Sequence, residues 1–310
     1  MTGVVTVAAW SDSVPGVALP TGSRCIPRAW SRSASSRRSQ ENRSTVAPYP
    51  RRPNRDRSAC RPPGSSRYRR EVLVAAALVP STALLVPGAA GRADVLPDER
   101  AAALTAVATM LEAAPDVVVV VPPGPASVLL GRLRPTLAAA GIDDTRLGLQ
   151  PRPTAGADAT TSVDDVASAV GLLLLDQTGW RGPVELAPAG VTDGATQRMR
   201  GDELVARRRT GLLLVGGLSA RHGPDGPLAT DERAAPFDDV LVVDLTDLSP
   251  GARSRLAAVP AHLASVLAIS AWGPWQVLLG AAPPDAPRAV LHHAGAPFGA
   301  AYATISWRWT

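Results

Sequence analysis

The amino-acid sequence predicts an α/β fold, specifically a three-layer α/β/α domain with a mostly parallel central sheet, preceded by a disordered basic leader. Three observations support this prediction. The chain changes composition at about residue 71, short apolar runs recur after that point, and segments with helical spacing separate those runs. Such alternation is typical of a parallel sheet that is covered by helices.

The charge distribution separates a leader, residues 1–70, from a folded domain, residues 71–310. The leader contains fourteen arginines and three acidic residues, a net charge of +11, whereas the other 18 basic and 24 acidic residues leave the domain at −6. Serine, arginine and proline dominate residues 31–70, so this stretch cannot bury enough apolar surface to offset chain entropy. We interpret the leader as a segment that is not a structural part of the protein. The alternatives are an arm for nucleic acid or anionic membrane, and a secretion signal with the apolar run 72–86.

The elements of the domain follow in order. The apolar run 72–79, closed by Pro80, predicts a strand that is covered on both faces. Ser162 to Asp165 has the form of a capping box and precedes an apolar stripe that predicts a helix through Leu174. Asp238 and Asp239 are most simply a turn or a helix cap. The other predicted elements are helices at 98–111, 125–137, 196–208 and 250–267 with a break at Pro260, a loop at 141–161, strands at 116–121, 183–188 and 210–215, and a closing, antiparallel pair of strands at 289–293 and 300–309.

Composition also narrows the functional class. The apolar runs of the domain are too short to cross a bilayer, and its net charge is negative, so we expect neither a membrane nor a nucleic-acid partner. Both cysteines, Cys25 and Cys60, lie in the leader, so the domain offers no thiolate ligand or nucleophile. These features predict a cytoplasmic protein.

The best candidate site is the loop 216–222, because ligands of open α/β sheets bind beyond the carboxyl ends of strands. Its candidate pocket residues are Gly216, Gly217, Ser219, Arg221 and His222. The alternative is a glycine turn in which serine and arginine satisfy loop carbonyl groups.

An enzymatic interpretation of the same loop is a damaged nucleophile elbow around Ser219, with His292 or His293 as base and Asp244 as its orienting group. The closing glycine of that motif is missing, and the turn at 224–227 leaves no room for the helix that follows such an elbow. We do not favour this interpretation.

Metal chemistry has few candidate ligands in this chain. The histidines are His222, His262, His292 and His293, and no histidine precedes His222. Because side chains alternate along a strand, we expect His292 and His293 to point to opposite faces of the sheet. The sequence therefore predicts no metal site.

Tryptophans gather near the carboxyl terminus, where Trp272, Trp275, Trp307 and Trp309 lie. Such rings usually provide buried area in the core. An aromatic-lined pocket is the less favoured alternative.

Seven segments of the domain resemble a known family. Val-Ala-Ala-Ala-Leu-Val-Pro at 74–80 and Leu-Leu-Val-Pro at 84–87 precede Leu-Leu-Leu-Asp-Gln-Thr-Gly-Trp at 173–180. Further segments are Gly-Leu-Ser-Ala-Arg at 217–221, Asp-Glu-Arg-Ala-Ala-Pro-Phe-Asp at 231–238, Pro-Trp-Gln-Val-Leu at 274–278 and Ala-Pro-Phe-Gly at 296–299. In this order and spacing they resemble actinobacterial proteins related to the catalytic-subunit superfamily of the class III extradiol ring-cleavage dioxygenases.

The resemblance implies an α/β fold whose active members hold non-haem Fe(II) with histidines and a carboxylate, and open catecholic rings with dioxygen. This sequence departs from the pattern where the metal ligands are expected. Ser81 stands in the turn after the first strand, and residues 122–125 are Pro-Pro-Gly-Pro in the turn after the second. Neither turn provides an imidazole, so the resemblance carries over the fold but not the iron site.

The sequence thus predicts a catalytically degenerate extradiol-dioxygenase-like domain that binds a small ligand or a partner near residues 216–222, with Ser81 and Asp238 as further pocket candidates and with no cofactor. The rival is a metal-dependent dioxygenase or related oxidoreductase that acts on an aromatic substrate and holds Fe(II) through His222, His292 or His293, and a carboxylate such as Asp238. A third interpretation is a homo-oligomeric scaffold. Whether the chain is an enzyme stays open at this point.

Overall fold

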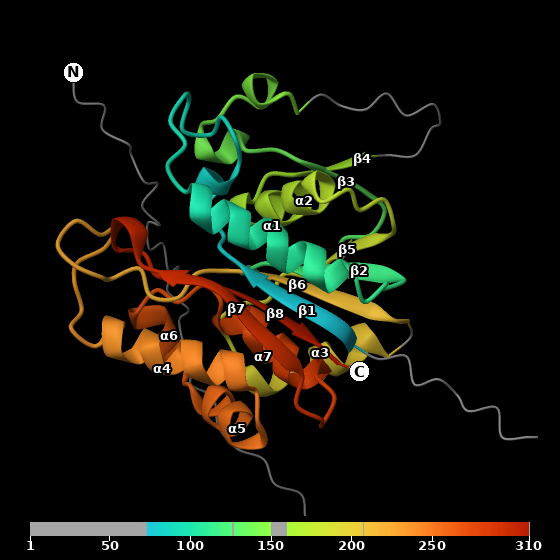
Figure 1. Ribbon diagram of the computed structural model, residues 1–310, viewed down its shortest axis with the longest axis vertical. Helices are drawn as coiled ribbons and strands as arrows, with labels where there is room; N and C mark the ends of the chain where they lie inside the picture. The colour runs from blue at the N-terminus through green and yellow to red at the C-terminus, as the bar shows by residue number, and fades with distance from the viewer. Residues whose placement is uncertain (1–72, 126, 150–159, 207, 310) are drawn as a thin grey trace, which may run out of the picture. The chain divides into compact units, whose positions relative to one another are not determined.

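The structure is a computed structural model that describes residues 73–125, 127–149, 160–206 and 208–309 (Figure 1). These residues fall within one compact unit, Arg69–Thr310. The predicted leader, 1–70, lies outside the described residues. Within the part of the chain that the structure describes, no helix has the length and apolar character that crossing a membrane requires.

A six-stranded sheet forms the centre of this unit, in the order β5-β2-β6-β1-β8-β7. Strands β5 (Val184–Leu186), β2 (Val117–Val121), β6 (Thr210–Val215) and β1 (Leu73–Val79) run parallel. Strand β8 (Tyr302–Arg308) is antiparallel to both β1 and β7 (Arg288–Gly295). The predicted α/β class with a mostly parallel sheet is therefore confirmed, as is the closing antiparallel pair.

Helices lie on both sides of the sheet because its central strands are apolar on both faces. Every residue of β1, β2 and β6 is buried. One core joins Ala75, Val118 and Leu213 to helices α1 (Pro97–Leu111) and α2 (Val166–Gln177). The other core joins alternate residues such as Leu78, Val119 and Leu212 to the helices on the opposite side (Figure 1). Those helices are α3 (Gly194–Val205), α4 (Ala234–Asp247), α5 (Pro250–Ala258), α6 (Ala261–Val266) and α7 (Trp272–Ala281).

Two predictions for the segment between β2 and α2 are wrong. The predicted helix at 125–137 does not form, because residues 132–135 are strand β3 (Arg132–Pro135), which pairs in parallel with β4 (Thr160–Val163) in a small second sheet. Gly131 has φ +104°, a value that no right-handed helix contains. The predicted capping box starts too early, because Ser162 belongs to β4. Asp165 caps α2 by accepting from the backbone N–H of Ser168 at 2.8 Å.

Helices α4 and α7 were not predicted. Asp238 lies inside α4 with 4 % of its surface exposed, so the prediction of a turn or cap at Asp238 and Asp239 is wrong. Its burial is tolerated because partners from the loop 216–222 reach the carboxylate. The predicted break at Pro260 is confirmed, since α5 ends at Ala258 and α6 begins at Ala261.

Helices α3 and α7 pack at backbone distance. A Cβ atom on Gly280 would lie 1.8 Å from the carbonyl oxygen of Arg198, and one on Gly201 would lie 2.1 Å from that of Val277. Both glycines are needed for this contact because any side chain would separate the helices.

Candidate functional site

The loop 216–222 leaves the carboxyl end of β6 beside the carboxyl end of β1. The N–H of Gly216 donates to the carbonyl oxygen of Val79 at 2.9 Å, which extends the β1–β6 ladder by one bond. A Cβ atom on Gly216 would lie 2.6 Å from the Cα atom of Ala271, so the start of α7 approaches closely only because this residue is glycine. The N–H of Gly217 donates to Ser270 Oγ at 2.7 Å. The loop is thus held at the sheet edge by β1 on one side and by the residues before α7 on the other.

Ser219 and Arg221 fasten this loop to its surroundings. Ser219 is fully buried, and its carbonyl oxygen accepts from the N–H of Ala301 at 2.7 Å. The Arg221 side chain donates from Nε to the carbonyl oxygen of Val266 at 2.6 Å and from a terminal nitrogen to that of Ala229 at 3.0 Å. Ser219 Oγ accepts from the N–H of Arg221 at 3.2 Å. The glycine-turn alternative expected serine and arginine to satisfy loop carbonyl groups. Arg221 does bind carbonyl groups, but those of Val266 and Ala229 lie outside residues 216–222, and Ser219 Oγ accepts from an N–H.

Asp238 and His222 of this loop form a carboxylate–imidazole pair. Nε2 of His222 lies 2.7 Å from Oδ2 of Asp238, and the N–H of Ser219 donates to both carboxylate oxygens at 3.1 and 3.2 Å. Burial raises the pKa of Asp238 above its ordinary value, and the bonds from His222 and Ser219 oppose that increase. The His222 side chain is 18 % exposed, so an imidazole oriented by a carboxylate is open to an approaching ligand. Such a pair can bind a polar group or exchange a proton with it.

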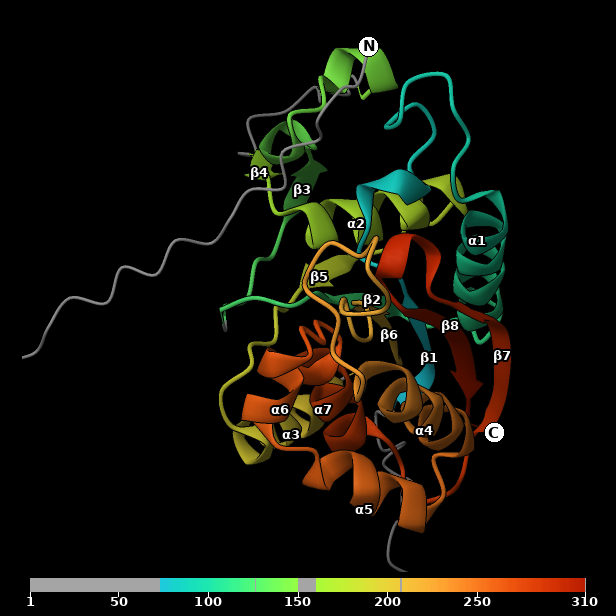
Figure 2. The same cartoon turned by 90° about the vertical axis from the view of Figure 1, so that its left-hand side faces the viewer.

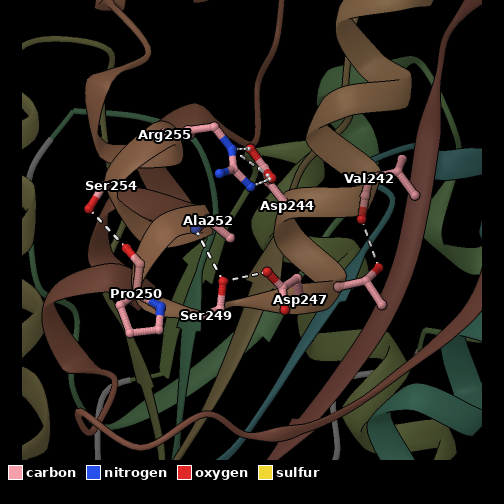
Figure 3. Close-up of polar contacts among 9 residues, drawn as sticks. Val242, Asp244, Asp247, Ser249, Pro250, Ala252, Ser254 and Arg255 are labelled. Carbon is pink, nitrogen blue, oxygen red and sulfur yellow. Dashed lines mark hydrogen bonds and ion pairs between the residues drawn. The ribbon is translucent and has the colours of Figure 1, made fainter.

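The nucleophile elbow does not assemble. Asp244, its expected orienting group, is bound by the guanidinium group of Arg255, with Arg255 Nε lying 3.0 Å from Oδ2 (Figure 3). Figure 3 also shows that Asp244 points toward α5, where Ser249 caps the helix by accepting from the N–H of Ala252. The hydroxyl group of Ser219 is buried against its own loop, so it has the environment of a structural group and not of a nucleophile.

His292 and His293 do not alternate across the sheet as predicted. A register shift lies between Leu291 and His293, and it places both imidazoles against partners on the α1 side. Nε2 of His292 lies 2.8 Å from Ser306 Oγ, and Nε2 of His293 lies 3.5 Å from Oε1 of Glu99 on α1. Burial lowers the pKa of His292. The prediction of opposite faces is wrong because a β-bulge adds one residue to β7 and breaks its period of two.

Sequence reasoning missed Tyr302 and Glu99. Tyr302 begins β8, and its ring lies 3.3 Å from the position that a Cβ atom on Gly217 would take. Burial is the main cause that raises the pKa of Tyr302, the Glu99 charge adds to it, and a hydrogen bond with Thr82 opposes it. Glu99 looks like an ordinary acidic residue of a first helical turn, yet it is only 9 % exposed. A single sequence carries no signal for that burial, since it depends on how α1 docks on the sheet.

Ser81 shares the sheet edge with the loop but not its contacts. It lies two residues beyond Val79 and is half-buried. Among the hydrogen bonds of the described residues, none joins Ser81 to His222 or Asp238. The structure therefore brings Ser219, His222 and Asp238 together and leaves Ser81 beside them as a neighbour.

The Fe(II) ligand set that the family resemblance implies does not fit these residues. In the described part of the chain, no three histidine, cysteine, aspartate or glutamate side chains are grouped so as to hold a metal ion. His222 pairs with Asp238, His292 with Ser306 and His293 with Glu99, so each imidazole has a separate partner. A site of two histidines and a carboxylate with open positions requires convergence on one point.

An open depression of about 280 Å³ lies elsewhere on the domain. Its walls are the start of α3, including Asp193 and Arg198, the junction of α5 and α6, and Trp272. None of the residues 216–222 lines it. The Asp193 carboxylate caps α3 by accepting from the N–H groups of Ala195 and Thr196, so these two donors of that helix end are already bound.

Comparison with known proteins finds no matching family model and no matching curated protein. Among solved structures, the chain is similar to the crystal structure of uncharacterized protein JW3007 from Escherichia coli K12. The two share 16 % sequence identity at a TM-score of 0.42, over 75 % of this chain and 99 % of that chain. A likeness this weak supports no conclusion about function.

Proposed function

We propose that this chain is a catalytically degenerate domain of the class III extradiol-dioxygenase type, a three-layer α/β/α protein of the cytoplasm that binds a small ligand or a partner at residues 216–222. The family resemblance of segments 74–80 through 296–299 motivates the assignment. The mostly parallel sheet, with helices on both sides, is compatible with it.

The separate pairing of the three imidazoles is the observation that carries the proposal. The rival site uses Asp238 itself as a metal ligand, so Oδ2 would have to give up its 2.7 Å contact with Nε2 of His222, and His293 would have to leave Glu99. Asp238 would also have to release the N–H of Ser219, which is buried and would lose its acceptors. Leaving a buried donor unsatisfied costs about 1–3 kcal/mol. The contacts of the loop with Asp238 therefore oppose the rearrangement that an ion would require.

Binding at the loop would use His222 as its exposed group. Asp238 holds Nε2, which leaves Nδ1 of the same ring without a hydrogen-bond partner in the described structure. Asp238 fixes the ring orientation, so a ligand would meet a prepositioned imidazole. A ligand with a hydroxyl group suits this imidazole, because the hydroxyl group can reach Nδ1.

Anaerobic titration of the full chain with Fe(II), followed by metal analysis, tests the degenerate assignment. We expect far less than one iron per chain, and no difference between the wild type and His222→Ala. His262→Ala is the matched control, since His262 is exposed on α6. About one iron per chain, lost in His222→Ala and kept in His262→Ala, would establish the dioxygenase alternative and reject our proposal.

Binding is tested separately with catechol as the probe and no metal added. In a chain labelled at histidine, we expect catechol to shift the His222 side-chain resonances and to leave those of His262 unchanged. The shift should disappear in Gly217→Val, whose side chain would occupy the space of the Tyr302 ring. Equal responses of His222 and His262 would remove the case for a ligand site at this loop.

A further inference from the structure

Strand β7 leaves one edge of the central sheet open. It is the terminal strand in the sheet order, and it lies at the rim of the sheet in Figure 2. Within the described chain, no backbone group of Arg288–Gly295 forms a hydrogen bond beyond its ladder with β8. The opposite edge differs, because β5 has three residues and Leu186 there exchanges two backbone bonds with Leu129, at 2.9 and 3.0 Å. An edge strand of eight residues with free donors and acceptors is a template for another strand.

Apolar side chains accompany the open edge. Val290 and Leu291 on β7 are 40 % and 41 % exposed. Leu291 is opposite Ile305, whose side chain belongs to the core on the α4 side. Helix α4 lies beside β7 on that side of the sheet (Figure 2). The strand contains no proline, and the features that discourage pairing are its bulge and the charge of Arg288 at one end.

We propose that the full chain forms a two-fold symmetric dimer in which β7 pairs antiparallel with β7 of a second copy. Two identical strands that pair antiparallel are related by a two-fold axis, so a second copy matches this edge without further adjustment. An axis perpendicular to the sheet keeps the two copies of α4 on the same side. The two Leu291 side chains then lie on the same side of the joined sheet.

Charge complementarity favours this arrangement. Arg288 begins β7, and it makes no ion pair with any residue that the structure describes. The other end of β7 lies near the first turn of α1, because His293 contacts Glu99 there, and Asp98 in that turn is exposed. Antiparallel pairing brings Arg288 of each copy to the end of β7 where the other copy places its Asp98. Arg288 is opposite Arg308 of β8, which pairs with Glu112 of α1, so both lie on the α1 side of the sheet.

Sedimentation velocity of the full chain over a range of concentrations tests the dimer. We expect the wild type to dimerise and Val290→Glu or Leu291→Glu to raise the dissociation constant at least about tenfold. Val266→Glu is the matched control, since Val266 is 46 % exposed on α6, away from β7. Circular dichroism of each variant establishes that it is folded. A wild type that stays monomeric, or a dimer unaffected by both substitutions, overturns the proposal.

A charge exchange tests the orientation of the two copies. Arg288→Glu should weaken the dimer at least severalfold, because it brings two carboxylates together. Adding Asp98→Arg to Arg288→Glu should restore the wild-type dissociation constant, whereas Asp98→Arg alone should weaken the dimer. Failure of the double variant to recover rejects antiparallel β7 pairing. Monomers that dimerise only after residues 1–70 are removed would show that the leader occupies the edge, which also overturns the proposal.

Discussion

The indole N–H of Trp275 has no hydrogen-bond partner in the described structure, although the residue is fully buried. Trp307 is also fully buried, but its N–H donates to the carbonyl oxygen of Leu245 at 2.8 Å. Leu245 lies in the last turn of α4, where carbonyl groups lack helical partners. Replacing each tryptophan by phenylalanine removes the same atoms and changes the unfolded chain equally. Any difference between the two variants therefore reports on the hydrogen bond.

We expect Trp307→Phe to destabilise the domain by about 2 kcal/mol more than Trp275→Phe, since a buried group left without a partner costs about 1–3 kcal/mol. Trp275→Phe removes an unsatisfied donor, which offsets part of its loss of packing. Trp275→Ala sets the scale at about 3–5 kcal/mol, the usual cost of deleting a buried aromatic side chain.

Urea unfolding followed by far-ultraviolet circular dichroism measures these differences independently of tryptophan fluorescence. Trp272→Phe is the control and should resemble Trp307→Phe, because Trp272 is 2 % exposed and its N–H donates to the carbonyl oxygen of Val259 at 2.9 Å. Equal costs for Trp275→Phe and Trp307→Phe would refute the reasoning. A thermally silent Trp275→Ala would further reject core packing of Trp275 and support the aromatic pocket.

The remaining predictions concern backbone packing, pH and the leader. Gly280→Ala should destabilise the domain by about 2 kcal/mol or more, because its Cβ atom would overlap the Arg198 carbonyl group, whereas Gly251→Ala, which meets only ordinary contacts, should be neutral or slightly stabilising in thermal unfolding. Asp238 has a pKa above its ordinary 3.8, so above pH 3.8 the folded state keeps a proton that the unfolded state releases. The free energy of unfolding should therefore fall as the pH rises from 3.8 through the folded-state pKa. Asp238→Asn should flatten that part of the pH profile, and an unchanged slope would contradict it. Removing residues 1–70 should leave the melting temperature nearly unchanged, and a decrease of more than a few degrees, on the order of 1 kcal/mol, would show that they pack on the domain.

The strands of the main sheet could be predicted because their side chains are buried on both faces. Residues 73–79, 117–121 and 212–215 are continuous apolar runs, and each lies in a fully buried strand of the parallel part of the sheet. Helices α1, α2, α3 and α5 were predicted for a related reason, since their local pattern and their tertiary environment agree.

Segments whose structure depends on a distant partner were predicted poorly. Residues 132–135 form a strand because residues 160–163 pair with them, and the sequence of neither segment indicates this pairing. Helix α4 was missed because Asp238 and Asp239 resemble a turn. The buried carboxylate of Asp238 inside a helix is explained only by its contacts with Ser219 and His222.

The candidate site divides in the same way. The sequence by itself determined the position of the loop 216–222, because glycines after a buried strand place a turn at the carboxyl edge of the sheet. The tertiary structure alone decided which partners the histidines contact. His222 pairs with Asp238 because of a helix that begins twelve residues after His222. A bulge in β7 turns His292 and His293 toward α1. Hydrophobic periodicity specifies which face of an element is buried. It does not specify which polar side chains meet, because those contacts depend on chain segments whose separation in sequence is unrelated to their separation in space.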